Sequence, residues 1–193
     1  MKKLVGVWLF YFVIIAFFYR NSLYSYFEGD EWYYFSIFLP LTHHPFGLLE
    51  TFIKSFTESN TISGGGHVAP LYNVIWFLLN KFFGLNFKYY IIFSLLTHTF
   101  NTFFLYIFTK GIIKNRLVPL LAGFIFAISC VHYEAITWVM AVVPTQISLL
   151  FTLLGLIFFI RKSFVIGLLF FLAGVFTKET VILVMVLAPL LLL

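Results

Sequence analysis

The sequence contains few charged residues. Lys, Arg, Asp and Glu make up 10% of the 193 residues, against about 25% in soluble domains. Hydrophobic residues reach 62%, which is more apolar side chain than a water-soluble core of this size buries. The composition therefore predicts an integral membrane protein that crosses the bilayer several times.

Other scarcities exclude further classes. The single cysteine, Cys130, excludes an internal disulfide and a metal site built from cysteines. The basic residues are dispersed and form no patch that alternates with aromatic residues, so nothing indicates nucleic-acid binding. Because no small-x-small cleavage site follows the first apolar run, we expect residues 4–19 to stay as a first span rather than to be removed as a signal peptide.

Apolar segments account for most of the chain. The candidate spans are residues 4–19, 89–109, 117–131, 135–160, 163–177 and 180–193. Residues 68–80 form a shorter run, and a run of roughly 10–14 residues is more typical of an interfacial or re-entrant segment. If this run does not span, all seven acids fall outside, and the basic residues before the first span and in the turns 110–116 and 161–162 fall inside, the distribution that the positive-inside rule favours. The residues placed inside are Lys2, Lys3, Lys110, Lys114, Arg116, Arg161 and Lys162.

Residues 20–88 then form a long first external loop. Within it, residues 46–56 have apolar side chains at helical spacing and predict an amphipathic helix lying on the membrane. The predicted fold class is an all-α integral membrane protein, a polytopic helix bundle of about six spans with interfacial helices in the external loop. We expect one membrane domain over residues 1–193, and because it ends in apolar sequence we expect a truncated chain or the N-terminal part of a larger protein.

The acids gather at one place in that loop. Glu28, Asp30 and Glu31 lie within four residues, and Asp30 is the only aspartate. Adjacent carboxylates repel each other and are costly to desolvate, so we expect them in an aqueous loop. One interpretation is an ordinary solvated loop. The other is a carboxylate held at the membrane surface to take a proton from an acceptor.

Polar residues inside the spans suggest how helices pack. Ser94, His98 and Asn101 share one face of the span 89–109, and polar residues within spans usually face the bundle. We therefore expect them to form hydrogen bonds between helices rather than to catalyse a reaction. We also expect the segment 135–160 to be kinked, or entered, at Pro144.

Four sets of short motifs occur in a recognisable order. They are Gly29-Asp30-Glu31; Pro70-Leu71-Tyr72 with Phe83-Gly84-Leu85-Asn86 and Thr97-His98-Thr99-Phe100-Asn101; Val131 to Trp138; and Thr177-Lys178-Glu179-Thr180. Together they resemble motifs of the GT-C glycosyltransferases, in particular the membrane part of the transmembrane, tetratricopeptide-bearing O-mannosyltransferases and their bacterial relatives. Cys130 departs from the family pattern, which has proline there, and Val143-Pro144-Thr145 replaces a basic residue and an aspartate found in many relatives.

The resemblance implies an inverting transfer of a sugar from a polyprenyl- or dolichyl-phosphate carrier to a protein or glycan acceptor. The reaction would occur at the external face, which we expect to be that of the plasma (inner) membrane. Asp30 or Glu31 would act as the base, and Glu134 would lie near the oxocarbenium-like centre. A cation would hold the leaving phosphate. The residues expected to bind substrate are Arg20, His67, His132, Lys178 and Glu179.

Several alternatives remain on sequence alone. No cofactor is required with certainty, and a divalent metal held by His67, His132 and carboxylates is conceivable, although no ligand spacing supports it. Glu134 is also compatible with an ordinary acidic residue in a loop. Lys178-Glu179 is also compatible with the end of a helix at the membrane interface, with the lysine side chain extended toward water. A non-catalytic membrane protein or an inactive fragment is a second possible class. A transporter is a third, but the acids lie at one face and no inverted repeat is visible.

Overall fold

A computed structural model describes residues 2–27, 29–58, 68–129, 131 and 133–192, and these residues contain helices and no strand. The first half comprises α1 (Lys2–Phe18), η1 (Arg20–Tyr24), α2 (Asp30–Thr42), α3 (Gly47–Thr57), α5 (Pro70–Phe83) and α6 (Phe87–Ile112). The second half comprises α7 (Leu117–Ile128), α8 (Tyr133–Thr137), α9 (Val139–Ala141), the π-helical turn η3 (Val142–Ile147), α10 (Ser148–Ile160), α11 (Phe164–Val175), α12 (Val181–Leu187) and η4 (Ala188–Leu192). The predicted all-α class is confirmed.

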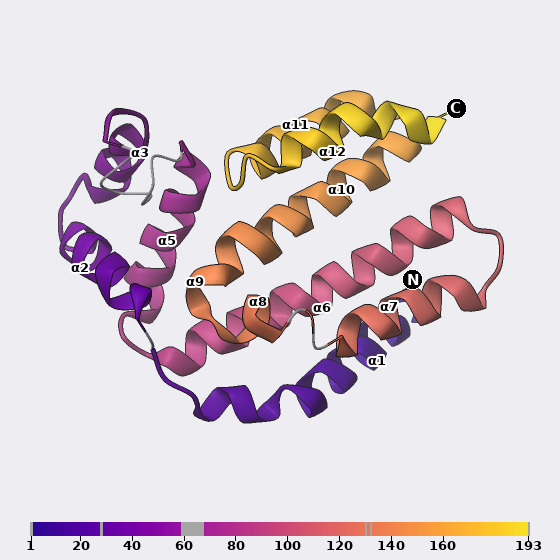
Figure 1. The fold of residues 1–193 in the computed structure, drawn as a ribbon, viewed down its shortest axis with the longest axis horizontal. Coiled ribbons are helices and arrows are strands. Elements are labelled where there is room, and N and C mark those ends of the chain that lie inside the picture. The colour runs from indigo at the N-terminus through magenta and orange to yellow at the C-terminus, as the bar shows by residue number, and fades with distance from the viewer. Residues whose placement is uncertain (1, 28, 59–67, 130, 132, 193) are drawn as a thin grey trace.

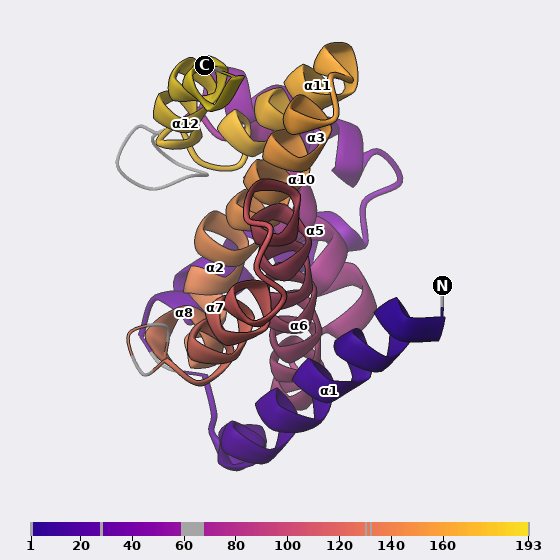
Figure 2. The ribbon, with the colours of Figure 1, turned by 90° about the vertical axis from the view of Figure 1, so that its right-hand side faces the viewer.

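The helices form an elongated bundle with two different ends (Figure 1). α1, α6, α7, α10, α11 and α12 run back and forth along the bundle, whereas α2, α3 and α5 gather at one end. Both termini and the turn between α6 and α7 lie at the opposite end, which faces the viewer in Figure 2. We call these the loop end and the terminal end.

Two helical stretches are long and apolar enough to cross a membrane, namely α6 and residues Val139–Ile160. The 26 residues of α6 extend about 39 Å at about 1.5 Å per residue, against a hydrocarbon core of about 30 Å. Four other apolar helices of the described residues are shorter: Lys3–Phe18, Leu117–Ile128, Phe164–Val175 and Val181–Leu190. The structure therefore indicates two candidate spans, and the bundle of about six spans stays a prediction.

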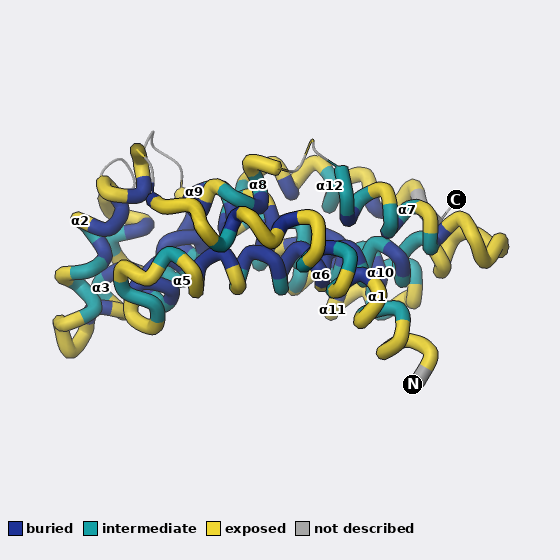
Figure 3. Tube along the Cα trace, turned by 90° about the horizontal axis from the view of Figure 1, so that it is seen from below, coloured by how far each residue is buried: buried dark blue, intermediate teal, exposed yellow. Residues whose placement is uncertain are grey.

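An aromatic cluster joins the loop end to the bundle. Trp76 of α5 is fully buried, and its ring centroid lies 6.0 Å from those of Tyr34 on α2 and Tyr90 on α6. Phe27, which precedes α2, packs edge-on against Tyr90 at 5.5 Å. Burial continues from here along α6 and α10 (Figure 3). Large rings bury much apolar area, so this cluster holds α2 and α5 against the start of α6.

The polar stripe of α6 packs inward, as predicted. Ser94, His98 and Asn101 are at most 1% exposed. The Ser94 hydroxyl donates to the Ile136 carbonyl at 2.6 Å, and the Asn101 amide donates to the Gln146 carbonyl at 2.9 Å. These hydrogen bonds attach α6 to α8 and to the π-helical turn.

The π-helical turn coincides with the proline expected to kink this segment. Pro144 has no N–H to donate, so the regular helical ladder is interrupted there and widens over Val142–Ile147. The turn directs Gln146 inward, where its side-chain amide donates to the Ser94 hydroxyl at 2.8 Å and to the Ala135 carbonyl at 2.6 Å. Turns of this kind often occur beside functional sites.

Helix α3 matches the predicted amphipathic helix and buries its small residues. Gly47, Thr51 and Ser55 face inward, and the Ser55 hydroxyl accepts a 2.9 Å hydrogen bond from the Asn73 amide on α5. The larger apolar side chains are exposed on the other face, including Leu49 at 56% and Ile53 at 50%. This orientation fits a helix whose apolar face contacts lipid.

Candidate functional site

A cleft of about 310 Å³ lies between the loop end and the turn that follows α11. We call it the first cleft. Its size is at the lower limit of ligand pockets, which span roughly 300–1,000 Å³. The residues with polar or aromatic side chains that line it include Asp30, Tyr34, Tyr72, Trp138, Lys178 and Glu179. Three predicted residues from two separate motifs, Asp30 from one and Lys178 and Glu179 from the other, therefore meet in one place.

Asp30 reaches the first cleft from the first turn of α2. Gly29 precedes the helix with φ +51°, a conformation that glycine adopts without steric cost. The first helical turn carries Asp30 and Glu31, where the helix dipole favours negative charge. Asp30 is exposed to solvent, so its carboxylate is accessible to a substrate.

The opposite side of the cleft is joined to α5 through the backbone. The amides of Leu71 and Tyr72 donate to the Phe176 carbonyl at 3.1 and 3.4 Å. Pro70 starts α5, where its missing N–H costs nothing. The motif at residues 70–72 and the motif at residues 177–180 are thus neighbours in space, which the sequence alone did not indicate.

Lys178 and Glu179 form a loose ion pair at this side of the cleft. The Lys178 ammonium lies 3.7 Å from a Glu179 carboxylate oxygen, and both side chains are partly exposed. An ion pair in contact with solvent contributes little to stability, typically about 0–1 kcal/mol. Lys178 is therefore available to a ligand anion at small energetic cost.

Two tyrosines form a polar and aromatic wall beside Asp30. Burial is the main cause that raises the pKa of Tyr34 above its ordinary value, and the hydrogen bond with Tyr72 partly opposes the rise. Burial also raises the pKa of Tyr72, and the neighbouring Tyr34 adds to the effect. Both phenols consequently stay protonated at neutral pH and retain an O–H group for hydrogen bonding.

A second cleft of about 350 Å³ contains the other two predicted catalytic acids, Glu31 and Glu134. Trp138 lines both clefts, so they are adjacent. Neighbouring residues of a helix point in directions about 100° apart, which explains why Asp30 and Glu31 line different clefts. The second cleft is also lined by Ser25, Tyr26, Tyr133 and Thr137.

The expectation that Asp30 and Glu31 are both exposed to water is wrong for Glu31. Both belong to α2, and Glu31 is only 1% exposed. The hydrophobic residues that follow, Tyr34, Phe35 and Phe38, are buried on the same helix, and their packing carries Glu31 inward with them. Charge alone predicted exposure for both acids, whereas the helical phase separates them.

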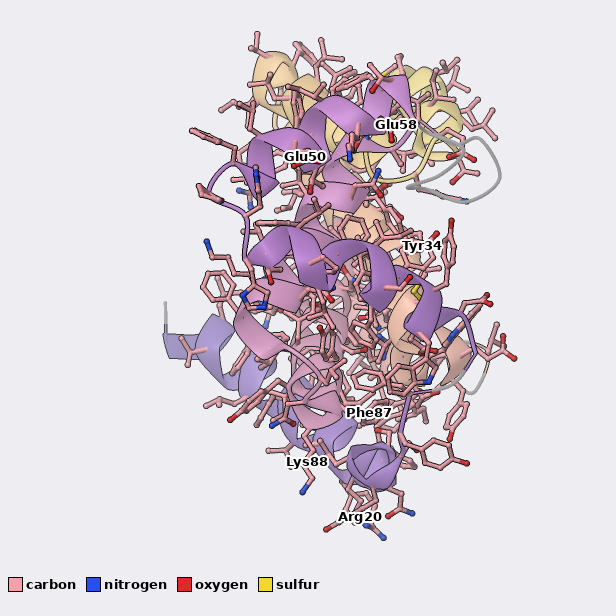
Figure 4. The ribbon with its side chains drawn as sticks, turned by 90° about the vertical axis from the view of Figure 1, so that its left-hand side faces the viewer. Arg20, Tyr34, Glu50, Glu58, Phe87 and Lys88 are labelled. Carbon is pink, nitrogen blue, oxygen red and sulfur yellow. The ribbon has the colours of Figure 1, made fainter. Side chains whose placement is uncertain are left out.

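Arg20, expected to bind substrate, lines neither of these clefts. It is exposed in η1, its guanidinium donates to the Phe17 carbonyl at 3.1 Å, and it stacks 4.7 Å from the Phe17 ring. Figure 4 shows Arg20 pointing away from the body of the molecule, far from Tyr34. His67 and His132, the other two predicted substrate-binding residues, lie outside the described residues, as do Glu28 and Cys130.

The described residues contain no group of three or more His, Cys, Asp or Glu side chains that could hold a metal. The histidines of the conceivable metal site, His67 and His132, are not among them.

Sequence reasoning missed the aromatic residues of the first cleft. Tyr72 follows Pro70-Leu71 within a recognised motif, and Trp138 ends the motif that starts at Val131, so a signal was present. Tyr34 lies four residues after Asp30, one helical turn further along the same face. Reading each motif as a helix face would have found all three.

Comparisons with known proteins add nothing to this description, because no family model, curated protein or solved structure matches the chain.

Proposed function

We propose that the chain is a membrane glycosyltransferase, or the N-terminal part of one, that moves a sugar from a polyprenyl-phosphate carrier to a protein or glycan acceptor. The observation that carries the proposal is the convergence of Asp30, Lys178 and Glu179 in the first cleft. A carboxylate, an ammonium group and aromatic rings in one cleft are the groups that such a transfer needs. The resemblance to GT-C motifs, which includes these three residues, supports the same conclusion.

The proposal includes a bundle of about six spans with the loop end outside. The helices that are short for a span expose large apolar side chains, among them Val13 at 63%, Val165 at 74% and Val186 at 67%. Patches of this kind are unfavourable in water and suit contact with lipid. The start of α2, α8 and the turn that follows α11 carry the acids of both clefts and lie toward the loop end, whereas the turn between α6 and α7 lies at the terminal end (Figure 1). This turn carries Lys114 and Arg116, a distribution that agrees with the positive-inside rule.

In this mechanism Asp30 is the general base. An acceptor hydroxyl oxygen attacks the anomeric carbon of the donor sugar while the Asp30 carboxylate takes the hydroxyl proton. The bond from the anomeric carbon to the phosphate oxygen breaks, and its electron pair leaves with the polyprenyl phosphate. One displacement at one carbon inverts the configuration there. The leaving phosphate gains charge, so it needs a cation more than a proton.

Lys178 supplies that cation. Its ammonium lines the same cleft as Asp30 and lies near the Glu179 carboxylate. A phosphate oxygen of the donor would bind this ammonium in place of the Glu179 carboxylate or together with it. A charge-assisted hydrogen bond to phosphate is stronger than a neutral one. The flat faces of Tyr34 and Trp138 can pack against the apolar C–H face of a sugar ring.

The second cleft gives Glu31 and Glu134 supporting roles. Glu134 is exposed in the first turn of α8, and Trp138, one turn later, lines both clefts. We assign Glu134 to the acceptor side, where a negative charge stabilises the oxocarbenium-like centre as in glycoside cleavage. We assign Glu31 the role of positioning Asp30, because it is the next residue of the same helix and its side chain is buried.

The deciding experiment compares charge-removing variants in the complete protein, reconstituted in liposomes. A panel of polyprenyl-phosphate sugars, starting with the mannose form, serves as donor, with an extract of glycan and peptide acceptors. We expect Asp30→Asn to lower the rate about 10²–10⁴-fold, the usual cost of removing a general base. Lys178→Gln should also lower the rate, and both variants should insert normally because these side chains are partly or fully exposed.

Glu58→Gln is the matched control. Glu58 is exposed just after α3 and does not line either cleft, and Figure 4 shows it apart from Tyr34. Its loss should leave the rate unchanged. If Asp30→Asn turns over like the wild type, the assignment of the base is wrong. If the wild-type protein transfers no sugar from any donor of the panel, a non-catalytic membrane protein becomes the better interpretation.

A further inference from the structure

A third cleft, of about 610 Å³, lies at the terminal end of the bundle. It is formed by the start of α1, the last turns of α6, the turn that follows and the start of α7. Four cations from these segments line it, namely Lys3, Lys110, Lys114 and Arg116, and none of the acids among the described residues does so. Figure 2 looks onto this end of the molecule.

Most of the rest of the wall is apolar, with Asn115 as a further polar residue. Leu4, Val7, Ile113, Pro119 and Leu120 line the same cleft. Tyr106 is also part of the wall, and the Lys110 ammonium lies 5.6 Å from the centre of its ring. Four like charges around one cavity repel each other, so an anion that occupied the cleft would relieve this repulsion.

We propose that the third cleft binds the phosphate headgroup of an anionic phospholipid, with the acyl chains against its apolar wall. Lysines attract phosphate as point charges and Arg116 can offer two parallel N–H donors. Basic pockets between membrane helices have this chemistry for lipid headgroups. A free phosphate ion would use the cations but leave the apolar wall in contact with water, which favours the lipid as occupant.

The inference rests on the membrane insertion proposed above but not on sugar transfer. The third cleft is at the opposite end from the first, and none of its lining residues has a role in the proposed chemistry. A structural or regulatory lipid at the inner leaflet would hold α1 against α6 and α7 at the end where the chain turns.

The test is native mass spectrometry of the complete protein in a mild detergent. Phosphatidylglycerol, phosphatidylcholine and inorganic phosphate are each titrated against the protein. We expect one tightly held phosphatidylglycerol, weak binding of phosphatidylcholine, and no displacement of the lipid by millimolar phosphate. The triple variant Lys110→Gln, Lys114→Gln, Arg116→Gln should bind phosphatidylglycerol on the order of 100-fold more weakly, because each cation contributes about 1 kcal/mol.

The control removes the same charge elsewhere. Arg20→Gln, Lys81→Gln and Lys88→Gln together change exposed cations that do not line the third cleft, and Figure 4 shows Arg20 and Lys88 near the loop end. This control should keep the affinity. Equal losses in both triple variants, or equal binding of both lipids, would mean nonspecific attraction and overturn the proposal. If inorganic phosphate displaced the bound phosphatidylglycerol, the cleft would be a site for a free anion, and the proposal of a lipid site would be overturned as well.

Asp30→Asn separates the two proposals. It should abolish sugar transfer and leave lipid binding unchanged, because Asp30 does not line the third cleft. Melting curves of every variant without lipid show whether the fold is retained. If the triple variant in the third cleft fails to fold, Lys114→Gln alone, which removes one cation from the exposed turn, should weaken binding about 5-fold, the equivalent of about 1 kcal/mol. An unchanged affinity for that single variant would reject the inference.

Discussion

Gln146 offers a direct test of how α6 is joined to α8 and to the π-helical turn. Its side-chain amide donates to the Ser94 hydroxyl at 2.8 Å and to the Ala135 carbonyl at 2.6 Å, and the Ser94 hydroxyl donates to the Ile136 carbonyl at 2.6 Å. We expect Gln146→Leu and Ser94→Ala each to destabilise the protein. Because the two side chains share a hydrogen bond, the double variant should lose less than the sum of the two.

The expected coupling energy is about 0.6 kcal/mol and at most about 1.7 kcal/mol, the range of hydrogen bonds between helices in membranes. The assay is reversible unfolding of the four proteins in mixed micelles with increasing SDS, analysed as a double-mutant cycle. Thr109→Val is the control, since the Thr109 hydroxyl bonds only to the Leu105 carbonyl of its own helix at 2.8 Å, and it should not couple to Gln146→Leu. Additive losses for Gln146 and Ser94 would refute the shared hydrogen bond.

Two further predictions concern topology and packing. In a Cys130→Ser background, an impermeant thiol reagent added to intact cells should label a cysteine at Glu134 and not one at Lys114; the reverse pattern would overturn the orientation. Gly47→Val should destabilise the docking of α3, because an added Cβ would lie 2.0 Å from the Leu41 carbonyl oxygen, whereas Gly6→Val, with nothing within 4 Å, should be neutral. Thermal unfolding measures both, and equal effects would contradict the close approach.

The sequence predicts most of the helices and part of the site. Apolar runs indicate where helices form, and the charged residues between them indicate which turns lie at the same end of the bundle. Both can be predicted because each signal lies within a short stretch of sequence. The meeting of Asp30 with Lys178 was expected only through the motif resemblance. The backbone bonds from Leu71 and Tyr72 to Phe176 depend on tertiary packing, which no local pattern encodes.

The misassigned residues have equally physical causes. Glu31 was expected in water because a carboxylate is costly to bury, yet the helical phase set by Tyr34, Phe35 and Phe38 carries it inward. Arg20 was expected to bind substrate as a cation that could hold the leaving phosphate, but it contacts its own helix end through Phe17. Gln146 was not singled out because its inward direction depends on the π-helical turn.

The bonds from Leu71 and Tyr72 to Phe176 also determine the order in which this protein can mature. Residues 30–72 leave the ribosome well before residues 176–179, and the chain is made at about 5–20 residues per second. During that interval the first cleft lacks the side that Lys178 and Glu179 form, although α2 and α5 can already pack against each other. Contacts so distant in sequence also form slowly. A truncated chain that stops before residue 176 would therefore insert its earlier helices without ever closing the cleft.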